Sequence, residues 1–133
     1  MKILSRKEIL EAEDIQVEQV LIPEWGEDAG VNVKGMNGSE RDIFESSLVN
    51  QRGQGIKVNT VNIRAKLASL TVVDENLQQV FTEKDVREIG KKSASALQRI
   101  FEVAQRLSGI SQGDVEELAE AMEDDPTEGS LSD

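Results

Sequence analysis

The sequence predicts an α+β fold that is predominantly helical, with one or two small antiparallel β-hairpins and a disordered acidic C-terminal tail. β-Branched and alternating segments occur only as short runs, whereas the longest periodic segment, 93–108, has helical spacing. A chain of 133 residues also suits one domain. We therefore expect residues 1–122 to form a single α+β domain, hairpin-rich in its N-terminal part and helical in its C-terminal part. Residues 123–133 are expected to form the tail.

The first expected elements are a capped helix and a hairpin. Ser5 and Glu8 have the spacing of a capping box, which predicts a helix over about 6–13. β-Branched residues then predict a strand over 15–22, and alternation of apolar and polar residues predicts its partner over 31–34. The two strands would form a hairpin with a long connection.

The long connection, residues 23–30, carries the single tryptophan of the chain, Trp25. A tryptophan is large and costly to leave in water, so we expect Trp25 to fold back over the end of the sheet. A role in recognising a partner is the alternative.

The middle of the chain is expected to form two helices, separated by a non-helical segment at residues 53–57. Asn37 and Glu40 form a second capping box, which predicts a helix along 38–50. Residues 53–57 read Gly-Gln-Gly-Ile-Lys, and without the spacing and the Ser or Thr of a phosphate-binding loop they indicate a mobile linker. Helical spacing then returns with three apolar residues, Ile63, Leu67 and Leu70.

In the last third of the domain, the sequence predicts a short hairpin followed by helices. Residues 71–73 and 78–81 flank a turn and suggest the hairpin, and Thr82 is placed to cap a short helix after it. The segment 93–108 is the strongest helix of the chain. Its apolar stripe consists of Leu97, Ile100, Phe101, Ala104 and Leu107. Residues 114–122 add one or two amphipathic turns.

The acidity of the protein belongs to its C-terminal end. The chain has 26 acidic and 15 basic residues, for a net charge of −11, and nine of the acids lie in 114–133, where there is no base. Residues 123–133 contain one apolar residue in eleven, too few to offset the entropy of ordering. This tail is either a solubilising segment or a docking segment for a basic partner. The net charge argues against nucleic acid as a partner.

Composition excludes several kinds of chemistry. The chain has no His and no Cys, so zinc sites of the usual type and Ser-His-Asp or Cys-His catalysis are ruled out. A calcium-loop frame from Asp74 to Asp85 has Gln at the sixth position, where the sharp turn needs Gly. We therefore expect no catalytic residue, metal or cofactor, and no enzyme activity. Apolar runs are too short to span a bilayer, so no membrane partner is expected.

Partner contacts are expected on apolar helix faces. The stripe of 93–108 is most simply core, and the alternative is a face that receives a partner's apolar helix, with Phe101 and Leu107 in contact. Leu118 and Met122 lie between the last capped helix and the tail, and they are the first candidates for a partner-contact edge.

Five segments follow one another in a characteristic order within residues 4–120. They are 20–26 (VLIPEWG), 36–45 (MNGSERDIFE), 70–75 (LTVVDE), 80–86 (VFTEKDV) and 97–107 (LQRIFEVAQRL). Together they resemble the tail assembly chaperones of long-tailed bacteriophages and prophages. One departure is Leu77, where the hairpin turn would be expected to have Gly.

The resemblance implies a non-enzymatic chaperone in the cytoplasm of the bacterial host. Such a protein binds the tape measure protein, keeps it soluble, promotes assembly of the tail tube around it and is not retained in the virion. A longer frameshifted form would contact the tail tube protein. The oligomeric state is left open, with a homo-oligomer as one outcome. The alternative function is that of a structural phage tail or head–tail connector protein, and a regulatory binding module ranks third.

Overall fold

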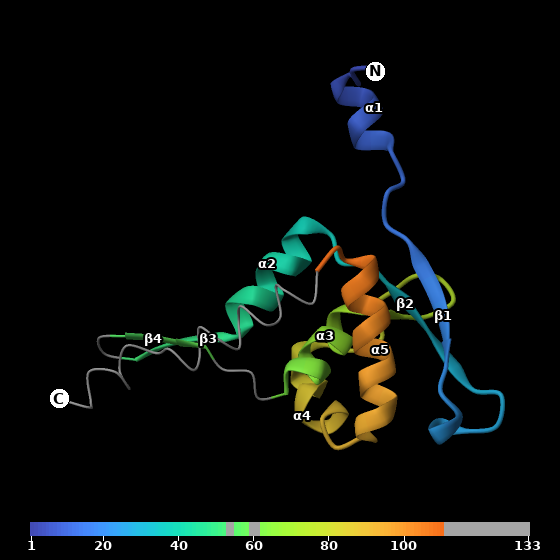
Figure 1. The fold of residues 1–133 in the computed structure, drawn as a ribbon, viewed down its shortest axis with the longest axis vertical. Helices are drawn as coiled ribbons and strands as arrows, with labels where there is room; N and C mark the ends of the chain where they lie inside the picture. Colours follow the sequence, from blue (N-terminus) through green and yellow to red (C-terminus); the bar gives the residue numbers. More distant parts are fainter. Residues whose placement is uncertain (53–54, 59–61, 111–133) are drawn as a thin grey trace.

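The α+β fold predicted from the sequence is confirmed by a computed structural model, which describes residues 1–52, 55–58 and 62–110. A three-stranded antiparallel sheet has the order β1-β2-β5, with β1 at Val17–Leu21, β2 at Gly30–Lys34 and β5 at Val72–Val73. Helices α3 (Ile63–Thr71) and α5 (Ala94–Leu107) lie beside one another and next to the sheet (Figure 1).

One face of the sheet is apolar because the strand residues alternate. Val20 lies opposite Val31, and Val33 lies opposite Val72, and all four side chains join the core or pack against it. This face contacts α5, which crosses both β1 and β2. The largest fully buried side chains among the described residues come from the sheet, the helices and the residues that flank them: Ile22, Val33, Leu48, Leu67, Thr71 and Ile100.

Helix α5 agrees with the sequence prediction to within one residue at each end. The Ser93 hydroxyl accepts a hydrogen bond from the Ala96 amide at 3.3 Å, which satisfies one of the free donors of the first turn. Gly109 follows the helix with φ +75°, a left-handed conformation that glycine adopts without strain. Four of the five stripe residues, Leu97, Ile100, Phe101 and Ala104, are buried, and Leu107 is half-buried.

Both capping boxes predicted from the sequence are present, but the two helices end early. Helix α1 is Arg6–Glu11, and its Ser5–Glu8 box is complete. Helix α2 is Gly38–Ser47, so the prediction of helix through residue 50 is wrong there. Leu48 is buried at the end of α2, and the β-branched Val49 then begins an extended segment.

The linker expected around residues 53–57 is wrong in the part that the structure describes. Strands β3 (Val49–Arg52) and β4 (Gly55–Val58) pair antiparallel as a separate two-stranded sheet. This hairpin connects α2 to α3 and extends away from the three-stranded sheet (Figure 1). The β-branched Val49, Ile56 and Val58 favour extended backbone, and this signal was too sparse to outweigh the nearby Gly residues.

The second predicted hairpin is only partly formed. Strand β5 pairs with β2, and the returning segment adds one isolated bridge, Val73 to Gln79. Asp74 stabilises the turn, because its Oδ1 accepts hydrogen bonds from the backbone N–H groups of Asn76 and Gln78 at 2.8 and 2.9 Å. Thr82 then caps a 3₁₀ turn, η2 (Glu83–Asp85), which continues as the predicted short helix, α4 (Val86–Ile89).

Leu77 lies in this turn with φ +64°, a left-handed conformation that is unfavourable for leucine. We expect Leu77→Asn to raise the free energy of unfolding by about 0.5–1 kcal/mol, because Asn tolerates this conformation better. Leu77→Ala is the control, since alanine keeps the backbone penalty. Urea denaturation of the three proteins checks this, and an equal gain for alanine would contradict the explanation.

The N-terminal segment stands apart from the body. Helix α1 has no buried residue, and it lies beyond the end of β1, joined to it by an extended stretch (Figure 1). The expected helix at 114–122, with Leu118 and Met122, and the expected tail at 123–133 lie outside the described residues. Among the residues that are described, no helix has the length and apolar character needed to cross a membrane.

Candidate functional site

An apolar pocket of about 490 Å³ lies where four segments of the chain meet. These segments are the 3₁₀ turn η1 (Pro23–Trp25), the end of α3, the stretch from Phe81 through α4, and the first half of α5. The apolar side chains that line the pocket are Trp25, Ala68, Val72, Phe81, Ile89, Leu97 and Ile100. Since these residues come from distant parts of the sequence, the pocket exists only in the folded protein.

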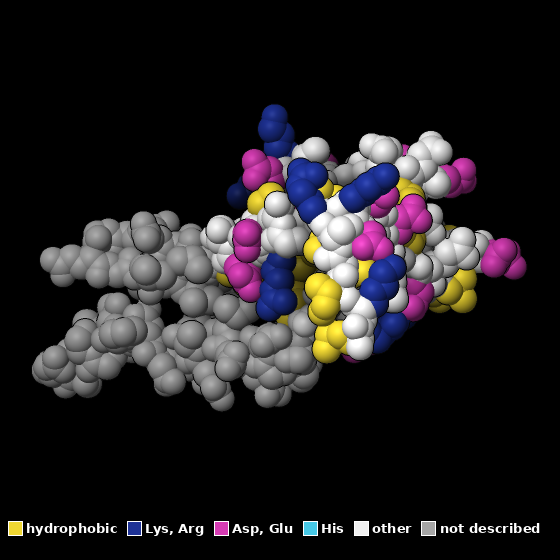
Figure 2. All heavy atoms as spheres, turned by 90° about the horizontal axis from the view of Figure 1, so that it is seen from above, with side chains coloured by type: hydrophobic (Ala, Val, Ile, Leu, Met, Phe, Trp, Pro, Cys, Tyr) yellow, Lys and Arg dark blue, Asp and Glu magenta, His cyan; other side chains and the backbone are white. Residues whose placement is uncertain are grey.

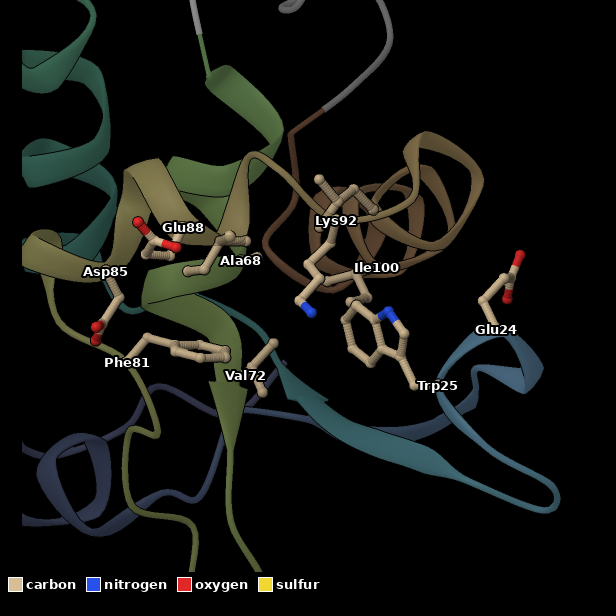
Figure 3. A pocket seen from close by; sticks show the side chains of 11 residues that line it. Glu24, Trp25, Ala68, Val72, Phe81, Asp85, Glu88, Lys92 and Ile100 are labelled. Carbon is tan, nitrogen blue, oxygen red and sulfur yellow. The ribbon is translucent and has the colours of Figure 1, made fainter.

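The two aromatic rings of the pocket define its width. Phe81 and Trp25 approach from opposite sides, with Ala68 and Val72 between them (Figure 3). Trp25 is 37% exposed, so it covers the pocket while keeping one side in solvent. The expectation that Trp25 folds back at the end of the sheet therefore agrees with its position, and its exposure leaves the recognition role open.

Charged residues stand at the rim of the pocket. Asp85 and Glu88 lie at the end near Phe81, and Lys92 lies at the end near Trp25 (Figure 3). Glu88 forms an ion pair with Lys91 at 3.3 Å, with both side chains largely exposed. An apolar interior with charges of both signs at its rim suits an apolar segment that has charged residues beside it.

The turn that carries Trp25 is fastened to α5 by polar contacts. The Arg99 guanidinium forms an ion pair with Glu24 and also donates to the Leu21 carbonyl at 3.2 Å. The Ser95 hydroxyl donates to the same Glu24 carboxylate at 2.8 Å. Arg99 and then Ser95 lower the pKa of Glu24 from 4.5 to about 2. These contacts hold the Trp25 turn against the first half of α5.

A second ion pair fastens the other end of β1. Arg106 Nη2 donates to both carboxylate oxygens of Glu18 at 2.9 Å. Arg99 and Arg106 are seven residues apart, so they lie on one face of α5. Arg106 contacts β1 through Glu18, and Arg99 contacts the turn that follows β1 through Glu24. The sequence analysis missed both pairs. The spacing of the two arginines was visible in the sequence, but their partners were not.

We expect the Glu24 contact to contribute to stability above about pH 4.5 and to be lost as the pH falls toward 2. The reason is that the folded protein binds this proton less readily than the unfolded chain does. Glu24→Gln should therefore lower the urea midpoint at pH 6, and this difference should shrink toward zero near pH 2. Glu27→Gln, on the same connection, is the control. A difference from wild type that does not change with pH would contradict the assignment.

A second hollow adjoins the pocket. It has a volume of about 880 Å³ and shares Trp25, Val72 and Phe81 with the pocket. It continues along β1 and β2, past Val20 and Val31. The two hollows together make a surface longer than one side chain needs, as expected for a site that receives a peptide segment.

Of the four residues predicted to contact a partner, the structure describes two, Phe101 and Leu107. Phe101 is 7% exposed and belongs to the core. The Arg64 guanidinium lies 5.7 Å from the centroid of its ring. Leu107 is half-buried near the end of α5, and Leu118 and Met122 are outside the described residues. Neither Phe101 nor Leu107 lines the pocket, and the contact of all four residues with a partner stays a prediction.

The pocket lining is mostly apolar. In residues 1–52, 55–58 and 62–110, no three His, Cys, Asp or Glu side chains are grouped so that they could hold a metal ion. The pocket lining combines seven apolar side chains with carboxylates and one lysine. Such a lining can remove apolar groups of a partner from water and select the charge of their neighbours.

Comparison with known proteins identifies the fold. No protein-family model matches the sequence, and no curated protein matches it. The solved structure of the bacteriophage HK97 tail assembly chaperone is similar, with a TM-score of 0.54 and 18% sequence identity. The similarity covers 76% of this chain and 94% of that chain. The resemblance noted in the sequence is thus confirmed in three dimensions: this chain has the fold of a bacteriophage tail assembly chaperone.

Proposed function

We propose that this protein is a phage tail assembly chaperone that binds the tape measure protein and keeps it soluble while the tail tube assembles around it. The observation that carries this function is the apolar pocket on a fold shared with the HK97 tail assembly chaperone. A longer frameshifted form would add contact with the tail tube protein. On this proposal the protein acts in the host cytoplasm and leaves before the virion is complete.

The pocket suits a client that would otherwise aggregate. An apolar helix in water associates with others of its kind, and a protein that covers its apolar face shifts that equilibrium toward the soluble state by mass action. The Phe81 and Trp25 rings offer a large apolar contact area, and their one polar group is the indole N–H of Trp25. The net charge of −11 would keep the complex soluble through repulsion between copies.

Co-expression tests this function. The client is the longest coiled-coil-rich product of the genes that neighbour this one, and its soluble fraction is measured with and without the chaperone. We expect the client to be insoluble alone, and to become soluble and co-elute with this protein in size-exclusion chromatography. Continued insolubility of the client would contradict the proposal.

Two variants separate the pocket from other surfaces. Trp25→Lys puts a positive charge on the pocket wall and should reduce the soluble client several-fold. Ile43→Asp changes an exposed apolar residue of α2 that does not line the pocket, and it should have no effect. Leu118→Asp tests the edge that was predicted from the sequence alone. If only Leu118→Asp releases the client, the client binds that edge and not the pocket.

Mass spectrometry of purified virions tests the alternative of a structural tail or connector protein. A chaperone should be absent from finished particles. A structural protein would be present at a fixed ratio to the tail tube protein.

A further inference from the structure

The second hollow, beside the pocket, combines exposed apolar side chains with charge of one sign. Its lining comes from β1, β2 and β5 and from the two connections that adjoin them. The apolar part includes Leu21, which is 59% exposed, and Val80, which is 48% exposed. Asp28, Asp74 and Glu75 also line it, and none of the described residues that do so is Lys or Arg. We call this surface the acidic hollow.

The three carboxylates of the acidic hollow belong to one end of the sheet. Asp28 lies in the connection between β1 and β2. Strand β5 runs antiparallel to β2, with Val73 opposite Asn32, so the residues after Val73 continue toward the start of β2. Asp74 and Glu75 are therefore directed to the end of the sheet that carries Asp28, although they are far from it in the sequence.

These carboxylates have no cation beside them in the described part of the chain. None of the three forms an ion pair with another described residue. The α1 end of the molecule is different, because Lys and Arg side chains lie there among Asp and Glu side chains (Figure 2). Like charges at one end of the sheet repel one another, and a cationic group brought by a partner would relieve this repulsion.

The terminal segments of this chain do not have the charge that the acidic hollow requires. Residues 1–16 carry three basic residues and four acidic ones. Residues 111–133 carry nine acidic residues and no basic one. Either segment would add negative charge to a surface that already has three carboxylates. Charge complementarity therefore favours a segment of another protein, one that is apolar and basic.

We propose that the acidic hollow selects client segments that carry Lys or Arg beside an apolar face. The proposal rests on the proposed function, because it assigns a charge to the segment that the pocket binds. The pocket and the acidic hollow share Trp25, Val72 and Phe81, so one segment can cover both. Its apolar face would continue from the pocket across Leu21 and Val80, and its basic side chains would lie beside the three carboxylates.

Three synthetic peptides test this preference on the full chain. They share an apolar face of Leu residues at helical spacing, lack Trp, and carry Lys, Gln or Glu on the polar face. Binding is followed by the emission of Trp25, the single tryptophan of the chain, which lines both surfaces. We expect the Lys peptide to bind about tenfold more tightly than the Gln peptide and the Glu peptide to bind most weakly. The preference should shrink between ~0.05 M and ~0.5 M NaCl, since salt screens exposed charges.

A pair of double variants separates the acidic hollow from the net charge of the chain. Asp28→Asn with Glu75→Gln removes two of its three charges, and Asn suits the φ of +57° at residue 28. Asp74 is kept because it stabilises the turn. The matched control, Glu13→Gln with Asp42→Asn, removes the same charge at exposed residues outside both surfaces. The hollow variant should bind the Lys peptide about three- to tenfold more weakly and the Gln peptide unchanged, whereas the control should behave like wild type.

Three results would overturn the proposal. A Lys peptide that binds wild type no more tightly than the Gln peptide would show that no charge is selected. An equal loss in both double variants would assign the preference to net charge. A change in the mass of the hollow variant alone, measured by light scattering, would mean that a second copy occupies the acidic hollow.

The proposed function can fail separately from this preference. A co-expressed client that stays insoluble with the wild-type protein contradicts the function itself. A client that becomes equally soluble with wild type and with Asp28→Asn, Glu75→Gln contradicts only the charge preference.

Discussion

Phe101→Ala is expected to lower the free energy of unfolding by about 3–5 kcal/mol. The side chain is 7% exposed and belongs to the central cluster, and its ring lies beneath the Arg64 guanidinium of α3. Removing it leaves a cavity between α3 and α5. A domain of this size has a total stability of about 5–15 kcal/mol, so urea denaturation should show a large fall in midpoint.

The control for Phe101 is Ile43→Ala. Ile43 is exposed on α2, and truncating it should change stability by less than about 0.5 kcal/mol. Together the two variants decide between the two roles that the sequence leaves open for Phe101. If Phe101→Ala kept its stability and lost client binding, the residue would be a partner contact and not a core residue.

Local signals in the sequence predicted the elements that local interactions determine. The boxes at Ser5–Glu8 and Asn37–Glu40 predicted where α1 and α2 begin, because each requires only residues three positions apart. The expectation of Gly in place of Leu77 is supported by its left-handed backbone. Helix α5 was predicted well because its stripe, Leu97 to Leu107, continues for about three turns.

The pocket could not be predicted in this way. Its two rings are 56 positions apart in the sequence and come together only because β1, β2 and β5 pair and α5 crosses them. The Glu24–Arg99 pair also joins residues that are distant in the sequence. Apolar residues of 93–108 were therefore considered for partner contact when most of them are used as core, and Phe81, which faces the pocket, was assigned only to a hairpin.

Gly35→Ala is expected to lower the free energy of unfolding by about 1–3 kcal/mol. Gly35 lies between β2 and α2, where the backbone passes the last turn of α5. A Cβ at this position would lie 2.5 Å from the Leu107 carbonyl oxygen and 3.0 Å from its carbon. Both atoms belong to the backbone, so relief requires moving α5 away from the sheet. The neighbouring Met36 amide donates to the Ser108 hydroxyl at 2.8 Å, and this bond would lengthen as well.

Gly38→Ala is the matched control for Gly35→Ala, because both changes restrict the unfolded chain to the same extent. A Cβ at Gly38 would meet no atom within 4 Å, and alanine suits the first turn of α2. Gly38→Ala should therefore be as stable as wild type or slightly more stable, and the difference between the two variants measures the clash with α5 alone. If the variants were equally stable, α5 would not be pressed against the β2–α2 connection. The position of α5, and with it the half of the pocket that Leu97 and Ile100 line, would then depend on the buried apolar face of α5 and on the two arginine–glutamate pairs instead.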